Sequence, residues 1–133
     1  MIGLDDLFTR LETALEAGGI AWWEIEFPSG VVFFSDLKAT IIGRKPTEFT
    51  HYGQFLDYMH PDDRESVNAS INDHLNGKVS SYEARYRIKH KDGHYLALYE
   101  RGKIVSSKGG ITKLAGIMID VGGQKKADKG ISV

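Results

Sequence analysis

The chain has no cysteine among its 133 residues. It therefore cannot form disulfide bonds, a thiolate nucleophile, cysteine-ligated zinc or iron–sulfur sites, or a covalent flavin–cysteinyl adduct. An excess of positive charge is also missing, because 17 basic and 18 acidic residues leave a net charge of −1. A nucleic-acid partner is not expected, since such proteins use a positive field to neutralise phosphates.

Long apolar runs are absent as well. No run approaches the about 18 residues of a membrane-spanning helix, and Asp5 and Asp6 stand where a signal peptide would be basic. We therefore expect a cytoplasmic protein without direct membrane insertion. Hydrophobic residues make up 41% of the chain and charged residues 26%, which is typical of one folded domain and excludes a disordered chain.

The periodicity of apolar residues predicts an α+β order of elements. A helix is expected over residues 4–17, and its apolar stripe consists of Leu4, Leu7, Phe8, Leu11 and Leu15. Alternation predicts strands over 20–27, 31–34, 80–89, 94–106 and 111–121. Helical spacing and capping signals predict short helices over 35–43, 46–49 and 52–59 and a longer helix over 60–77. Tight turns between neighbouring strands favour a five-stranded antiparallel sheet with the short helices covering one face.

The second hairpin allows its register to be predicted. If Lys91-Asp92-Gly93 is a three-residue loop, Ile88 lies opposite Leu96, Tyr86 opposite Leu98, and Glu83 opposite Arg101. A two-residue loop would pair lysine and arginine with leucine, so we favour the first register.

Several segments, in this order, resemble the PAS domain family, in particular the branch that carries the sequence His-Pro-Asp-Asp-Arg. They span about residues 18–128 and comprise the hairpin segment 19–30, residues 60–64, the strand and turn 82–93, residues 100–102 and the closing strand 116–121. The resemblance implies an N-terminal flanking helix over 1–18, a sensory domain over 19–121 and a linker over 122–133.

By this resemblance the domain is a sensory input module and not itself an enzyme. It implies a small ligand or a partner that modulates a linked output domain, most often a two-component histidine kinase and next a cyclic-di-GMP enzyme such as a diguanylate cyclase. The strand end at Asp120 and Val121 then corresponds to the signal junction. A homodimer is also expected.

A ligand pocket is expected between the helices and the concave face of the sheet. The candidate lining residues are Phe55, Met59, Val67, Ile71, Tyr86, Leu96, Leu98 and Met118. A filled core is the competing interpretation of the same residues, and a ligand-free dimerisation or scaffolding module the competing function. A small isomerase- or hydrolase-like enzyme is a third hypothesis, but Glu100, turned inward by the register, has no obvious partner.

Aromatic residues are also expected on the opposite face of the sheet, where Trp22, Tyr95, Ala97 and Tyr99 point away from the short helices. Such a face needs a cover. We expect the apolar stripe of the N-terminal helix to cover it, in the same chain or in a dimer partner.

The histidines are interpreted mainly as structural residues. His60 is expected to cap a helix that Pro61 begins, with Asp63 reaching back to the His60 N–H. His74 borders an apolar stripe, and we interpret it as a solvated edge rather than a haem ligand. No metal site is expected from His51, His60, His90 and His94, because no pair is backed by a third ligand.

Overall fold

The structure, a computed structural model, describes residues 2–122. Within these residues the chain forms four α-helices, one short 3-10 helix and five strands. Their order is α1 (Leu4–Ala17), β1 (Ala21–Phe27), β2 (Val32–Phe34), α2 (Asp36–Ile41), η1 (Pro46–Glu48), α3 (Tyr52–Tyr58), α4 (Pro61–Leu75), β3 (Tyr82–Lys89), β4 (Tyr95–Lys108) and β5 (Ile111–Asp120).

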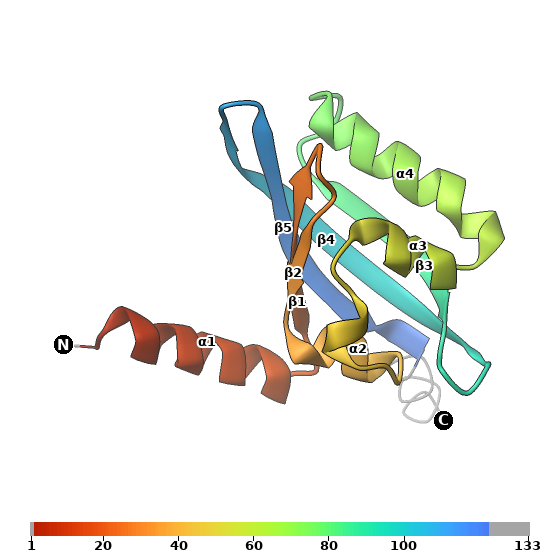
Figure 1. Ribbon diagram of the computed structural model, residues 1–133, viewed down its shortest axis with the longest axis horizontal. Coiled ribbons are helices and arrows are strands. Elements are labelled where there is room, and N and C mark those ends of the chain that lie inside the picture. Colours follow the sequence, from red (N-terminus) through yellow and green to blue (C-terminus); the bar gives the residue numbers. More distant parts are fainter. Residues whose placement is uncertain (1, 123–133) are drawn as a thin grey trace, which may run out of the picture.

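The strands form one antiparallel sheet in the order β2-β1-β5-β4-β3. The pairing of β1 with β5 joins the first strand group to the last, and α2, α3 and α4 lie together over one face (Figure 1). The predicted α+β fold is therefore confirmed.

The register of the β3–β4 hairpin is also confirmed. Ile88 pairs with Leu96, Tyr86 with Leu98 and Glu83 with Arg101, and Gly93 has a φ of +105°. Alternate residues of β3 are consequently buried, which places Tyr82, Ala84, Tyr86 and Ile88 under the helices.

The β4–β5 turn is shorter than the sequence predicts. Lys108 still pairs with Ile111, so the loop contains Gly109 and Gly110 alone, with φ values of +59° and +79°. Positive φ at both central residues matches the twist of a two-residue hairpin, and the strands extend further as a result.

The start of α4 differs from the predicted capping arrangement. His60 does cap the helix, because its Nδ1 accepts the N–H of Asp62 at 3.1 Å. Asp63 does not reach back. Its carboxylate instead accepts the backbone N–H of Arg87 at 2.8 Å and pairs with that guanidinium at 2.9 and 2.8 Å. The Asp63 carboxylate therefore bonds to Arg87 of β3 instead of capping its own helix, and this ion pair connects α4 to the sheet.

Helix α1 extends to the side of the sheet (Figure 1). The Phe8 and Trp22 rings meet edge to face at 6.5 Å, and Trp22 Nε1 donates to Glu12 Oε2 at 3.0 Å. No residue of α1 is buried within the described part of the chain. Within the chain, the helix thus contacts Trp22 but leaves Tyr95 44% exposed, so it covers only part of the outer face.

Tyr99, on the same outer face, has partners on β3 for both its hydroxyl and its ring. Its hydroxyl donates to Glu83 Oε1 at 2.8 Å, and the Arg85 guanidinium lies 4.7 Å from its ring centre. Across residues 2–122, no helix is both long and apolar enough to span a bilayer.

Candidate ligand pocket and polar cluster

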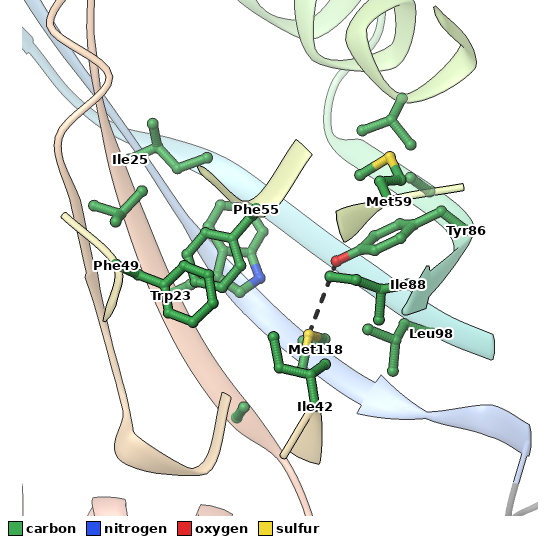
Figure 2. Close-up of a cluster of buried hydrophobic side chains, with 14 of the residues drawn as sticks. Trp23, Ile25, Ile42, Phe49, Phe55, Met59, Tyr86, Ile88, Leu98 and Met118 are labelled. Carbon is green, nitrogen blue, oxygen red and sulfur yellow. Dashed lines mark hydrogen bonds between the residues drawn. The ribbon is translucent and has the colours of Figure 1, made fainter. Parts of the chain in front are cut away.

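A small cavity lies between the sheet and the short helices. Its free volume is about 20 Å³, which is room for roughly one water molecule. Apolar side chains dominate the walls, and Figure 2 shows several of them around Trp23 and Tyr86. The lining residues are Trp23, Ile25, Val32, Phe34, Lys38, Tyr52, Phe55, Met59, Val67, Ile71, Tyr82, Tyr86 and Glu100.

A buried ion pair forms one wall of this pocket. Lys38 Nζ of α2 lies 3.1 Å from Glu100 Oε1 of β4, and both side chains are less than a tenth exposed. Two tyrosines of β3 complete the cluster: Tyr86 OH donates to Glu100 Oε1 at 2.6 Å and Tyr82 OH to Oε2 at 2.9 Å. We refer to Lys38, Tyr82, Tyr86 and Glu100 as the polar cluster.

The polar cluster keeps its tyrosines protonated. Burial, and then the negative charge of Glu100, raise the pKa values of Tyr82 and Tyr86 well above their ordinary range. Both hydroxyls are therefore fixed as donors to a carboxylate. A buried ion pair gives little net stability over apolar residues unless such extra bonds satisfy it, so the cluster meets the condition for a stable buried charge pair.

Lys38 makes two further contacts. Its Nζ lies 3.4 Å from Met118 Sδ and 4.6 Å from the centre of the Phe55 ring. The cation on α2 therefore contacts α3, β4 and β5, so a movement of either helix would alter its environment.

Trp23 supplies an unpartnered donor to the same pocket. The side chain is 3% exposed, and its Nε1 finds no hydrogen-bond partner among the described residues. Its ring lies on two glycines, since a Cβ at Gly102 or Gly116 would come within 2.8 or 2.7 Å of it. A buried N–H without an acceptor is costly, and an acceptor within the pocket would remove that cost.

The predicted pocket residues fall into two groups. Phe55, Met59, Val67, Ile71 and Tyr86 line the cavity. Leu98 and Met118 are buried in the surrounding core, with Met118 Sδ 3.9 Å from Tyr86 OH, and Leu96 packs partly buried against that core.

The sequence reasoning missed the charged half of the site. It turned Glu100 inward correctly but found no partner, whereas the structure gives it three. Lys38 lies 62 residues away in sequence and on a short helix, so no local pattern connects the two. Tyr82 carried a usable signal, because the register places it on the same face as Tyr86.

His74 is buried, which corrects the expectation of a solvated edge. Its Nδ1 lies 3.0 Å from the Val79 carbonyl, and its Nε2 accepts the Ile104 N–H at 3.0 Å. Both ring nitrogens are thus occupied by backbone groups, and the ring links α4 to β4. A haem bound through His74 does not fit this arrangement.

His90 and His94 face each other at the tip of the β3–β4 hairpin, with ring centres 4.8 Å apart. The expectation that no third ligand accompanies them was wrong. Asp92 Oδ1 lies 3.0 Å from His90 Nδ1 and also contacts His94 Nδ1. Partial burial would raise the pKa of Asp92, but hydrogen bonds from His94 and the two imidazoles lower it overall.

The end of β5 is ordered up to the expected junction. The strand ends at Asp120, whose Oδ1 accepts the N–H of Gly122 at 3.0 Å, and Val121 begins a helical turn. The rest of the expected linker, residues 123–133, lies outside the described residues.

Two curated proteins and one crystal structure illustrate what the chain is similar to. It is 30% identical over 110 residues to the methyl sulfide methyltransferase-associated sensor of Methanosarcina acetivorans, covering 80% of this chain and 11% of that protein. It is 28% identical to the probable diguanylate cyclase DgcE of Escherichia coli, covering 86% of this chain and 10% of that one. The chain spans about a tenth to a quarter of the curated relatives it matches.

A sensory box histidine kinase/response regulator from Burkholderia thailandensis has a similar fold, with a TM-score of 0.72, 22% identity and coverage of 92% of both chains. The family model described as PAS fold matches residues 31–118. These residues contain β2 to β4, most of β5 and the whole polar cluster, whereas β1 lies outside them. The chain is a sensory input module and belongs to the PAS fold family.

Proposed function

We propose that this domain binds a small, mostly apolar molecule carrying a hydrogen-bond acceptor, and that binding changes the activity of a linked output domain. The curated relatives include sensors and a probable diguanylate cyclase, and the similar fold comes from a histidine kinase. We assign the output to one of these two enzyme classes. We also assign the chain to the branch carrying His60-Pro61-Asp62-Asp63-Arg64, on its matching sequence.

The observation that carries the proposal is the Trp23 Nε1–H, a buried donor without a partner beside an otherwise satisfied polar cluster. Apolar walls with few fixed polar groups are typical of small-molecule sites. An acceptor atom near Trp23 would satisfy the donor, while the apolar part would contact residues such as Phe55 and Ile71.

A ligand larger than water must enlarge the cavity of about 20 Å³. The short helices α2 and α3 carry Lys38 and Phe55, so an occupant that displaces them also alters the polar cluster. A ligand shifts such an equilibrium only by the ratio of its affinities for the two arrangements. The enlarged arrangement is therefore the one that the ligand selects.

Strand β1 offers a direct route from the pocket to the flanking helix. Trp23 points into the pocket, and its neighbour Trp22 points to the opposite face, as successive strand residues do. Trp22 contacts Phe8 and Glu12 of α1. A displacement of β1 at Trp23 would therefore move the attachment of α1.

Catalysis by this domain has weaker support. The oxygens of Glu100 are occupied by Lys38 and the two tyrosines, and tyrosines with raised pKa values are poor proton carriers near neutral pH. A cofactor held through His74 or through a cysteinyl adduct is also unsupported by the residues present.

A ligand-free dimerisation module is the second candidate, and the small volume of the cavity favours it. Its surface would comprise the exposed stripe of α1 with the outer face of the sheet. The residues are Leu4, Leu7, Phe8, Leu11, Leu15, Trp22, Tyr95 and Tyr99. Here the α1 stripe of one chain would cover the aromatics of its partner.

Native mass spectrometry of gently purified protein tests the choice between these functions. We expect a constant additional mass that disappears on denaturation. Val67→Phe should abolish it, because Val67 lines the cavity and is 1% exposed. Val105→Phe is the matched control, since Val105 is 59% exposed.

Each outcome separates the candidates. Loss of the extra mass in Val67→Phe alone, with a cooperative melt retained, supports the ligand pocket. Should Val67→Phe fail to fold, Trp23→Phe provides the test, because it removes the donor with little change in volume. Wild-type protein that is detected as a dimer without additional mass contradicts the ligand proposal and favours the ligand-free dimerisation module.

A further inference from the structure

The tip of the β3–β4 hairpin brings three metal-ligating side chains together, well away from the pocket. The ligand atoms of His90, Asp92 and His94 all lie within 4.8 Å of one another. All three belong to a loop whose backbone is held by bonds from His90 N to His94 O at 2.8 Å and from Gly93 N to His90 O at 2.9 Å. Loop closure alone therefore assembles the cluster.

The cluster places electron-pair donors against one another. Both imidazole Nδ1 atoms approach the same carboxylate oxygen, Asp92 Oδ1. The Nδ1 of His90 also accepts the Asp92 backbone N–H at 3.1 Å, so this nitrogen carries a lone pair and no proton. The lone pair of His90 Nδ1 therefore faces the Asp92 carboxylate oxygen 3.0 Å away and repels it unless a cation lies between them, whereas His94 Nδ1 can donate a proton to that oxygen. A metal ion can replace that proton and neutralise all three groups together.

The two histidines differ in how firmly they are held. The His90 ring packs on the backbone at the end of α2, since a Cβ at Gly43 would lie 2.5 Å from its ring atoms. Lys91 N also donates to Ile42 O at 3.0 Å. The side chains of His94 and Asp92 are 55% and 61% exposed. One ligand is thus fixed, and two are free to adjust at a solvent-accessible edge.

From this arrangement we infer that His90, Asp92 and His94 form a binding site for one divalent transition-metal ion of the zinc type. Two imidazoles and one carboxylate suit Zn²⁺, with water as the fourth ligand, whereas Mg²⁺ and Ca²⁺ prefer oxygen ligands alone. Two nitrogens bound at about 2.0–2.1 Å lie at most about 4.2 Å apart, so a small rotation of His94 closes the site.

Metal bound at the hairpin tip would also affect α2. The hairpin tip contacts the end of α2, and α2 also carries Lys38 of the polar cluster. Metal binding would fix His90 against Gly43 and thereby restrict movement of that helix end. The site would act alongside the pocket and does not depend on its being occupied.

Isothermal titration calorimetry of the untagged chain with ZnCl₂ tests this inference. We expect one Zn²⁺ per chain, and no comparable heat with MgCl₂. His94→Gln and Asp92→Asn should each weaken binding by at least about tenfold, the minimum effect of disturbing even the outer shell of a metal site.

His51→Asn is the matched control and should bind Zn²⁺ like the wild type. His51 is another exposed histidine, and asparagine retains an acceptor at this helix cap, where His51 Nδ1 accepts the Gly53 N–H. The histidine-ring ¹⁵N signals of His90 and His94 should also shift on adding Zn²⁺, while that of His51 stays. Absence of binding, equal binding by both loop variants and wild type, or equal weakening by His51→Asn would overturn the inference.

Discussion

Glu100 shows how one buried charge can be held by residues from two other elements. Lys38 comes from α2, the two tyrosines from β3, and the carboxylate itself from β4. The tyrosine hydroxyls donate two bonds that the lysine alone cannot supply. The stability of this group therefore depends on the whole polar cluster and not on the ion pair alone.

Replacement of Lys38 tests that dependence. We expect Lys38→Met to lower the free energy of unfolding by about 3–5 kcal/mol, because it leaves an uncompensated buried carboxylate. Adding Glu100→Gln to that variant should recover part of the loss, since the amide oxygen still accepts from the tyrosines. Urea denaturation measures both values, and strictly additive losses would show that the two residues are not coupled.

Asp63 gives the fold a pH dependence with a definite sign. Its bonds to Arg87, opposed by partial burial, hold the pKa of the carboxyl below its usual range. A carboxyl with a lowered pKa in the folded state stabilises the fold above the unfolded value of about 3.9, and this stabilisation is lost as the pH falls through the folded value.

Asp63→Asn should therefore be less stable than the wild type from about pH 5 to pH 7, with the gap closing below about pH 4. Thermal melts across this range provide the measurement. Asp62→Asn is the matched control, because it removes the same charge from the same helix turn and Asp62 is 79% exposed. A gap of constant size down to pH 2.5 would be inconsistent with the Asp63–Arg87 pair.

At the level of single residues, the sequence predicts the face of the sheet to which a side chain points better than the residue that it contacts. Alternation along β3 and β4 turned Tyr86 and Glu100 inward because side chains alternate across a strand. The same pattern carries no information on which distant residue meets them, so Lys38 was missed. Asp63 and His74 were misinterpreted for a related reason: their partners belong to β3 and β4, beyond the helix that carries them.

Among the elements, β4 and β5 leave no room for a side chain at Gly116, where the Trp23 ring crosses the sheet. Trp23 pairs directly with Gly116, which in turn pairs with Gly102 on β4. A Cβ at Gly116 would lie 1.9 Å from Arg101 O and 2.7 Å from the Trp23 ring. Glycine at this position is what allows the indole to lie on the sheet and direct its N–H into the pocket.

Gly116→Ala should consequently destabilise the domain by about 1–3 kcal/mol or more, the range for overpacked cores. Gly18→Ala is the control, because its nearest contact would be an ordinary 3.5 Å. The shift in melting temperature reports both. Equal melting of Gly116→Ala and the wild type would mean that β4 and β5 separate without cost at this point.

The elements themselves were largely predictable, because helix and strand periods, glycine turns and the hairpin register are local properties. The length of β4 was underestimated, since Ser107 and Lys108 are polar yet continue to pair with β5. The position of α1 relative to the sheet was not predictable, because its apolar stripe suggests burial but does not specify where.

For the molecule as a whole, the sheet order determines how the proposed ligand pocket would be connected to α1. The central pairing of β1 with β5 places both chain ends of the sensory domain beside the same strands. Trp22 and Trp23 then lie next to each other in sequence but on opposite faces, one against α1 and one in the pocket. The residue that would contact a ligand in the proposed pocket is thus the sequence neighbour of the residue that contacts α1.

The two tryptophans, the only two in the chain, allow this to be measured in one experiment. In a ¹H–¹⁵N spectrum each gives one indole N–H signal, so a screen of small molecules with acceptor groups reports the pocket through Trp23 and the α1 attachment through Trp22. We predict that a binding molecule shifts both signals with the same saturation curve. If compounds that shift Trp23 leave Trp22 unchanged at saturation, or if none shifts Trp23, the account of a ligand-responsive pocket coupled to α1 is contradicted.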